Sequence, residues 1–214
     1  TKNPANPTEG SVRAGSAPAY STCSWTYENS IGEAARFSAG GSIDLSETYS
    51  SDPAPGTYPY AAMLISKDFK IKGKFGPVAG QTFYTTGTFG DSTTDISSWG
   101  TTTAPLASFS GPTESTASVE GIPVTGGIMN AYLLDSTGTV LISDTEEGSP
   151  ETINPCTGQE KLLGVMNMSS DLTLDDNTNG LEMTFVVTNA MSVMVEDDAL
   201  VFDSNAFSVT FETF

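Results

Sequence analysis

Residues 128–143 read IMNAYLLDSTGTVLIS and form the clearest strand–turn–strand pattern in the chain. Apolar residues stand on both sides of the segment DSTG at 135–138. Asp and Gly at such positions are typical of the tight turn that joins two antiparallel strands. This stretch therefore predicts a β-hairpin.

Short strand patterns continue on both sides of this hairpin. On the C-terminal side they cover residues 161–168, 181–188, 191–195, 199–202 and 207–211. On the N-terminal side they cover residues 23–27, 35–46, 61–65, 67–75 and 83–89. Gly and Pro separate many of these segments, and no segment shows helical periodicity over more than about two turns. The pattern predicts an all-β fold, namely a single β-sandwich or jelly roll of antiparallel strands with long Ser/Thr/Gly/Pro loops.

The first 22 residues differ in pattern from the rest of the chain. Residues 1–22 contain Pro4, Pro7 and Pro18 and little hydrophobic periodicity, which favours an extended N-terminal arm or linker. Residues 23–214 are expected to form the β-sandwich domain. Within it, residues 49–60 are interpreted as a stiff loop, and residues 90–120 as a long loop or short edge strands.

Charge and composition exclude several function classes. The formal net charge is −18, which argues against nucleic acid because phosphate binding needs clustered Lys and Arg. The chain has no histidine, so Ser-His-Asp and Cys-His catalysis cannot arise within it. Paired carboxylates of a glycosidase are formally available, but no spacing marks two as partners. We therefore expect no enzyme, and no apolar run is long enough for a membrane span.

The two cysteines bear on where the protein works. Cys23 and Cys156 are expected to form a long-range disulfide in an oxidising compartment, with two buried thiols as the alternative. A Ser/Thr-rich, lysine-poor composition also fits an extracellular or cell-surface protein. The sequon at Asn167 would carry a glycan only in a secretory route that adds one.

One segment has the pattern of a calcium loop. Residues 175–180 read DDNTNG, with oxygen-bearing side chains at alternate positions before a Gly. Such oxygens suit a hard cation. The expected ligands are Asp175, Asn177, Asn179 and Glu182. The EF-hand pattern then fails at its twelfth position, Val186, and a plain turn is the alternative.

Two further sets of residues are candidates for binding. Tyr58, Tyr60 and Trp99 lie in Pro/Gly/Ser/Thr-rich stretches and predict a carbohydrate-binding surface, because flat aromatic faces stack on sugar rings. Lys70, Lys72 and Lys74 alternate with apolar residues and predict a basic face for assembly with another copy. The alternative for the lysines is protection of an edge strand.

A short segment resembles a known family. Residues 37–46 (FSAGGSIDLS) are similar to a stretch near the start of biofilm-fibre subunits of the TasA/camelysin type. The similarity covers ten of the 214 residues. It implies a secreted jelly roll that polymerises by donating an N-terminal strand to the next subunit.

Together these patterns predict a secreted structural subunit that assembles into an extracellular filament, pilus-like fibre or surface layer through strand or arm exchange. Its expected partners are copies of itself. The alternatives are a surface lectin or adhesin that binds glycans, with calcium as its one candidate cofactor, and a virion coat or decoration protein. Fold class alone does not separate these functions.

Overall fold

The computed structural model describes residues 15–18, 23, 26–28, 53–109, 117–141, 158–187, 190–196, 199–205 and 207–214. Nearly all regular structure in these residues is antiparallel β-strand, and the one helical element is the short 3-10 helix η3 (Ile96–Ser98). The predicted all-β class is therefore confirmed. No helix within the described ranges has the length and apolar character needed to cross a membrane.

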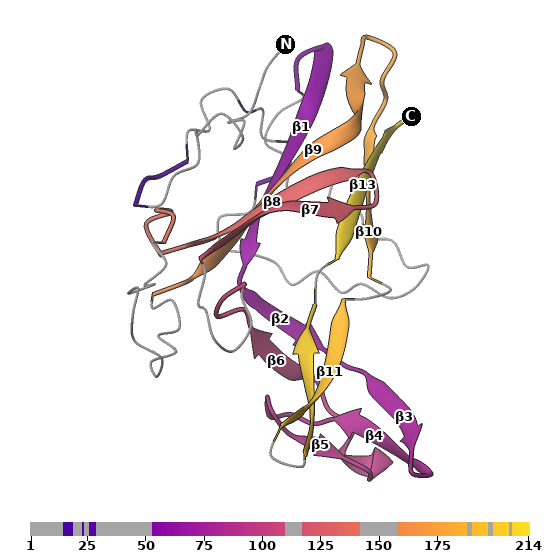
Figure 1. The fold of residues 1–214 in the computed structure, drawn as a ribbon. Coiled ribbons are helices and arrows are strands. Elements are labelled where there is room, and N and C mark those ends of the chain that lie inside the picture. The colour runs from indigo at the N-terminus through magenta and orange to yellow at the C-terminus, as the bar shows by residue number, and fades with distance from the viewer. Residues whose placement is uncertain are drawn as a thin grey trace.

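The larger part of the molecule is here called the sheet lobe (Figure 1). Its four-stranded sheet has the order β1-β9-β8-β7. The strands are β1 (Gly56–Ser66), β9 (Lys161–Leu174), β8 (Gly127–Leu134) and β7 (Ser118–Val124). A two-stranded sheet of β10 (Leu181–Val186) and β13 (Ser208–Thr213) lies beside it, with β13 in contact with β9.

The core of the sheet lobe lies on both faces of β8 and β9. Successive side chains of a strand point to opposite faces. Tyr132 and Leu134 therefore join one cluster with Leu163, while Leu133 joins another with Leu162. All five side chains are buried. The apolar run AYLL at 131–134 thus reflects a strand that is covered on both faces.

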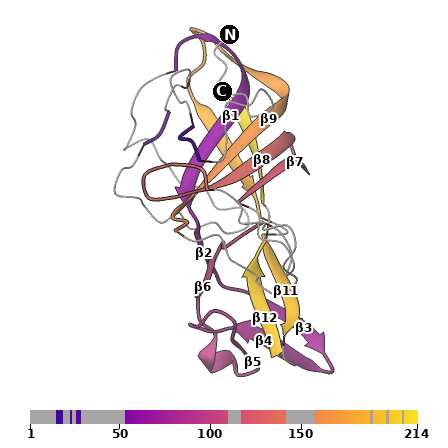
Figure 2. The same ribbon diagram turned by 60° about the vertical axis from the view of Figure 1, so that its left-hand side comes forward.

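The smaller part, here called the tip lobe, lies at the other end of the molecule in both views (Figures 1 and 2). It contains three small sheets, with orders β2-β6, β3-β4-β5 and β11-β12. The strands are β2 (Asp68–Ile71), β3 (Lys74–Val78), β4 (Gln81–Thr85), β5 (Ser92–Thr93), β6 (Thr102–Pro105), β11 (Met191–Glu196) and β12 (Ala199–Ser204).

The tip lobe is built from two insertions into the sheet lobe. The first runs from β2 to β6 and lies between β1 and β7 in the chain. The second is the β11–β12 hairpin, which lies between the paired strands β10 and β13. The Asn205 amide donates to the Ala190 carbonyl over 2.9 Å and closes the neck of this hairpin. Strand β12 contacts β2, β5 and β6, so the two insertions pack together.

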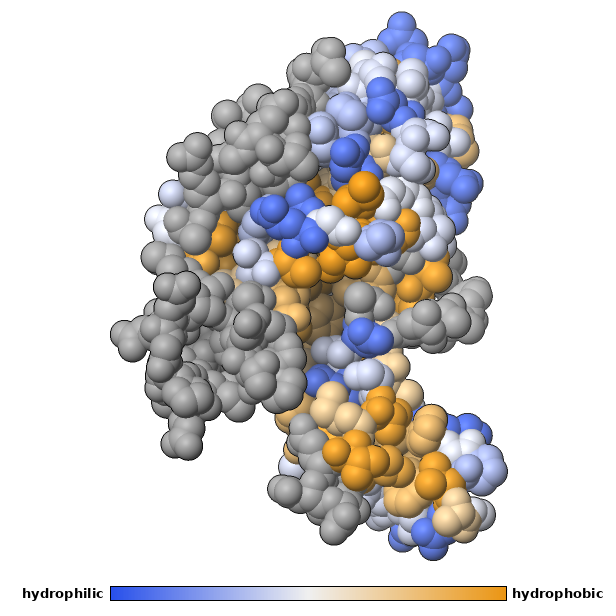
Figure 3. Space-filling view, in the orientation of Figure 1, coloured by the Kyte–Doolittle hydropathy of each residue, from blue (hydrophilic) through white to orange (hydrophobic). Residues whose placement is uncertain are grey.

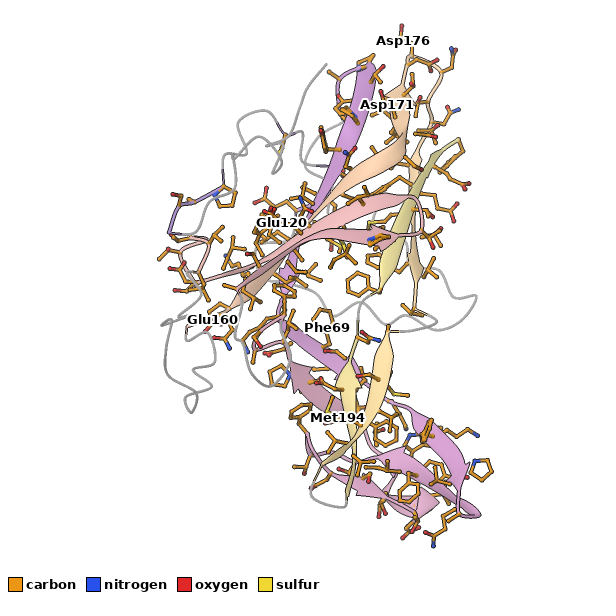
Figure 4. The ribbon with its side chains drawn as sticks, in the orientation of Figure 1. Phe69, Glu120, Glu160, Asp171, Asp176 and Met194 are labelled. Atoms are coloured by element: carbon orange, nitrogen blue, oxygen red, sulfur yellow. The ribbon has the colours of Figure 1, made fainter. Side chains whose placement is uncertain are left out.

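Aromatic rings fill the junction between the lobes. Phe207 stands between Phe69 of β2 and Phe185 of β10, at ring-centroid distances of 6.0 and 5.7 Å. Both distances fall in the range in which aromatic pairs attract each other. Figure 4 shows Phe69 where the two lobes meet.

Several expected elements differ from the observed ones. Residues 49–60 were expected to be a loop, but β1 begins at Gly56 and includes Tyr58 and Tyr60. The register of β1 against β9 shifts between these two tyrosines. Pro59 lies at this irregularity, which is a position where a strand tolerates a proline.

The alternating segment 67–75 was expected to be one strand but forms two. The chain leaves β2 after Ile71 and starts β3 at Lys74. Gly73 lies in the break, where an added Cβ would meet the Met191 sulfur at 2.3 Å. Residues 90–120 were expected to be a long loop or short edge strands, and they contain the short strands β5 and β6, the helix η3 and the start of β7.

The turn of the hairpin predicted at 128–143 is confirmed, whereas its second strand is described only as far as Leu141. The Gly138 amide donates to the Asp135 carbonyl over 3.0 Å, which closes the predicted turn. Within the described residues, the returning chain bridges Leu134 through Val140, and the regular partners of β8 are β7 and β9. The five C-terminal strands predicted at 161–211 are all present.

The described strands are distributed over five small sheets, so a single sandwich or jelly roll is not confirmed. The predicted strand at 35–46 lies outside the described residues. The predicted arm at 1–22 lies outside them as well, apart from residues 15–18.

Candidate functional site

The tip lobe exposes large apolar side chains. Figure 3 shows hydrophobic residues gathered on the face of this lobe that is turned to the viewer. The exposed apolar residues of the tip lobe, here called the tip surface, are Phe75, Val78, Phe89, Ile96, Met194 and Val195. Val195 is the most exposed of them, at 70%. Groups of exposed apolar side chains commonly mark interaction surfaces.

The two strands of the β11–β12 hairpin differ in burial. Val201 and Phe202 of β12 are buried, at 5% and 1% exposure, because β12 packs on β2, β5 and β6. On β11, Met194 and Val195 remain exposed (Figure 4). Among the described residues, β11 pairs with β12 alone, so no described strand covers its outer edge. An exposed apolar edge strand is a template for pairing with another strand.

Thr85 fixes the part of the tip lobe that carries the lysines. This buried hydroxyl donates to the Gly100 carbonyl over 2.6 Å and accepts from the Gly73 amide over 3.2 Å. Main-chain bonds between Thr85 and the same two glycines support it. Gly100 has no room for a side chain, since an added Cβ would lie 2.8 Å from the Gly87 nitrogen. These hydrogen bonds hold Gly73, which precedes β4, and Gly100, which follows it, next to Thr85.

Trp99 lies in this framework and is engaged by its neighbours. The Lys72 ammonium stands 5.0 Å from the centre of its ring, and the Tyr84 ring lies 5.4 Å away. The indole nitrogen is buried and has no hydrogen-bond partner among the described residues. Trp99 therefore packs against Lys72 and Tyr84 within the tip lobe and is half-buried.

The three predicted assembly lysines are all exposed. Lys70 lies in β2, Lys74 begins β3, and Lys72 lies between the strands. Phe69 and Ile71 are half-buried between them, so the predicted alternation is present in β2. None of the three forms an ion pair within the described part of the chain, where the Lys67–Asp68 pair at 2.8 Å is the one found.

The predicted aromatic trio is not brought together. Tyr58 and Tyr60 belong to β1 in the sheet lobe, whereas Trp99 belongs to the tip lobe. The Tyr58 hydroxyl donates to the Ala54 carbonyl over 2.5 Å. The three rings thus lie in different lobes, and carbohydrate binding by any of them stays a prediction.

Tyr60 lines a different feature, here called the sheet hollow. It is an open hollow of about 340 Å³ on the four-stranded sheet. Its lining residues are Tyr60, Glu120, Gly121, Ile128, Asn130, Val165 and Asn167. The residues come together because Tyr60 and Ile128 both pair with Asn167 in the sheet. The sequence pattern did not reveal the polar members, which are scattered over three strands.

Glu120 and Asn130 are fixed at the edge of the hollow. The Asn130 side-chain oxygen Oδ1 accepts from the Gly121 amide over 2.7 Å. The buried Tyr132 hydroxyl donates to Glu120 over 3.1 Å. Burial raises the pKa of Tyr132 well above its ordinary value, and the negative charge of Glu120 raises it further, so this hydroxyl keeps its proton.

The predicted calcium loop forms the turn between β9 and β10. The Asp175 carboxylate accepts from the Asn177 amide over 2.8 Å and from the Thr178 hydroxyl over 3.3 Å. These bonds hold the pKa of Asp175 below its ordinary value. The Asn179 side chain donates to the Asn177 carbonyl. The turn thus satisfies its own polar groups, and calcium binding there stays a prediction.

No metal-binding group of three or more His, Cys, Asp or Glu side chains occurs in the described ranges. Cys23 is half-buried, while Cys156 lies outside those ranges, so the disulfide also stays a prediction. The family-like stretch at 37–46 lies outside them too.

Comparison with known proteins adds no relative. No family model matches the chain, and neither the curated proteins nor the solved structures contain a significant match.

Proposed function

We propose that the chain is a secreted structural subunit that assembles with copies of itself into an extracellular filament, pilus-like fibre or surface layer. Assembly proceeds through exchange of a strand or of the N-terminal arm. In this proposal the sheet lobe is the β-sandwich of the subunit, with β10 and β13 as a layer beside the four-stranded sheet. The subunit acts as a building block and catalyses no reaction.

The observation that carries the proposal is the open edge of β11. Val195 and Met194 are exposed on a strand whose outer backbone groups have no partner among the described residues. An added strand would pair with these groups and cover the apolar side chains at the same time. The net charge of −18 keeps copies apart in other orientations, so contact is favoured where apolar surface offsets the repulsion.

Microscopy and light scattering of the purified chain test this proposal. We expect filaments or sheets in negative stain as the concentration rises, and we expect Val195→Asp to abolish them, since a carboxylate would face the incoming strand. Ile128→Asp is the matched control, because it also changes an exposed β-branched residue but lies on β8. A chain that stays monomeric at every concentration would refute the proposal.

A second candidate function is glycan binding in the sheet hollow. Tyr60 offers a ring there, while Glu120 and Asn167 offer exposed hydrogen-bonding groups. Sugars are bound by this combination of an aromatic face and polar side chains. A glycan array would show binding that Tyr60→Ala removes and Trp99→Ala leaves intact. Absence of binding by the wild-type chain across a broad glycan array would exclude this candidate function.

A further inference from the structure

The chain contains one Asn-Gly pair, formed by Asn179 and Gly180. It lies in the turn between β9 and β10, at the far end of the sheet lobe, where Figure 4 shows Asp176. Asn179 is exposed and Gly180 is half-buried. An Asn side chain that precedes glycine is chemically labile, because the glycine nitrogen has no Cβ beside it to hinder its approach to the side-chain amide carbon. The pair is therefore a candidate for spontaneous covalent modification.

In the folded chain, both reacting groups are engaged in other hydrogen bonds. The Gly180 amide donates to the Phe214 carbonyl over 3.1 Å, and the Asn179 amide donates to the same oxygen over 2.6 Å. The Asn179 side-chain nitrogen Nδ2 donates to the Asn177 carbonyl over 3.0 Å. Attack requires the Gly180 nitrogen to release its proton and the Asn179 side chain to turn toward it, so these bonds oppose the reacting geometry. The reaction therefore requires local opening of the turn.

The contact with Phe214 also favours a glycine at position 180. The Phe214 amide donates to the Gly180 carbonyl over 3.3 Å, so the two residues extend the β10–β13 ladder by one hydrogen-bonded pair. A Cβ added at Gly180 would overlap the ring of Phe214. The packing that favours glycine thus leaves the preceding asparagine open to attack whenever this end of the ladder opens.

We propose that Asn179 deamidates through opening of this turn, which makes it an intramolecular modification site of the folded chain. The Gly180 nitrogen bonds to the side-chain carbon of Asn179, and the bond from that carbon to Nδ2 breaks. Nδ2 leaves as ammonia with the proton that Gly180 gave up. Water then opens the cyclic imide at either of its carbonyls, which gives aspartate or isoaspartate. The chemistry needs no oxidant, and it does not depend on assembly of the chain.

The product differs from asparagine in charge and in backbone length. A new carboxylate joins Asp175 and Asp176, which are both exposed in the same turn. Isoaspartate also routes the main chain through the side-chain carbon, so the amides of residues 179 and 180 no longer both reach the Phe214 carbonyl as they do now. Hydrogen exchange of the modified chain should show faster opening in β10 and β13 and little change in β8 and β9.

Peptide mass spectrometry of the folded chain, incubated at mildly alkaline pH, tests the site. We expect aspartate and isoaspartate to accumulate at Asn179 at least about tenfold faster than at Asn177, which is exposed in the same turn but precedes the β-branched Thr178. In urea, where packing against Phe214 is lost, Gly180→Ala should slow the reaction at least about tenfold, because a Cβ then flanks the reacting nitrogen. An unconverted Asn179 in the folded chain after prolonged incubation would overturn the proposal, and aspartate without isoaspartate would overturn the cyclic imide.

A matched pair of variants, each shown to be folded by circular dichroism, tests control of the rate by the turn. The Asp175 carboxylate accepts from the Asn177 amide, so Asp175→Ala should populate the open turn and speed deamidation of Asn179 about fivefold. Asp176→Ala removes the same charge but no hydrogen bond observed among the described residues, and should leave the rate within about twofold of the wild type. Equal rates in the two folded variants, or a folded wild type that reacts as fast as the chain in urea, would show that opening of the turn does not control the reaction.

Discussion

The sheet lobe and the tip lobe place their apolar residues differently. In the sheet lobe, long strands bury Tyr132, Leu133 and Leu163 to 2% exposure or less. In the tip lobe, Ile96 of the short helix η3 and Val195 of the six-residue strand β11 are exposed at 63% and 70%, although Phe202 of β12 is buried to 1%. The tip lobe also depends on a buried polar hub, Thr85.

This difference indicates a division of roles. Apolar burial is the main source of folding stability, so the sheet lobe is expected to supply most of it. The tip lobe leaves more of its large apolar side chains exposed. Changes in the sheet lobe should therefore act on stability, while changes on the tip surface should act on association.

The largest expected effect is on the core of the sheet lobe. Leu133→Ala should lower the free energy of unfolding by about 2–5 kcal/mol, because it removes contacts at a fully buried position and leaves a cavity. Urea denaturation followed by fluorescence measures this loss. Ile128→Ala, on the same strand but half-exposed, should change stability by less than about 0.5 kcal/mol. Equal losses in the two variants would contradict the assigned core.

The second prediction concerns the polar hub of the tip lobe. Thr85→Val should cost about 1–3 kcal/mol, because the Gly73 amide and the Gly100 carbonyl lose their hydroxyl partner in a buried place. Hydrogen exchange should show faster opening in the tip lobe and little change in β8 and β9. Thr85→Ser keeps the hydroxyl and should open less. Uniformly faster exchange across both lobes would show that they unfold as one unit.

The third prediction is smaller and concerns the Lys72–Trp99 contact. Lys72→Met should reduce stability by about 0.5–1 kcal/mol, since the methionine keeps an apolar stem but loses the cation over the ring. Lys70→Met removes the same charge without an observed ring contact and serves as the control. Chemical denaturation and the Trp99 emission spectrum measure the difference, and identical behaviour of the two variants would contradict the contact.

The smallest expected effect is local and depends on pH. Hydrogen bonds from the Thr137 side chain and the Thr139 amide lower the pKa of Asp135 below its ordinary value. The charged carboxylate therefore stabilises the turn above about pH 4, and this contribution is lost as pH falls through the lower pKa of the folded state. Amide chemical shifts of Thr137 and Thr139 should move in that range. Asp135→Ala should abolish the movement.

The sequence predicted local structure better than it predicted spatial arrangement. Turn chemistry at Asp135–Gly138 and alternation at β2, β11 and β13 were readable because they depend on neighbouring residues. The pairing of β8 with β7 and β9, rather than with the chain after its own turn, depends on distant segments. The two-lobed division was not visible in any local pattern, because each lobe draws on separate parts of the chain.

The candidate surfaces were likewise predictable only where they depend on residues that are neighbours in the sequence. Lys70, Lys72 and Lys74 were correctly expected to be exposed, since they alternate with apolar residues along one stretch. The sheet hollow was missed because Glu120, Asn130 and Asn167 meet only through strand pairing. The sequence did contain one signal for the tip surface. Residues 191–195 read MSVMV, which places apolar side chains on both faces of a strand. Its partner β12 is the more buried strand of the hairpin, so some apolar side chains of β11 stay exposed.

The closed neck of the β11–β12 hairpin joins this insertion to the rest of the chain at one place. The two ends of this insertion meet where the Asn205 amide donates to the Ala190 carbonyl, and the flanking strands β10 and β13 are paired with each other. The hairpin can therefore vary at its exposed positions, Met194 and Val195, while β10 and β13 keep their register, whereas Val201 and Phe202 of β12 are needed because they are buried against the first insertion. Sequence variation at the exposed positions is thereby uncoupled from the strand pairing that holds the insertion in place.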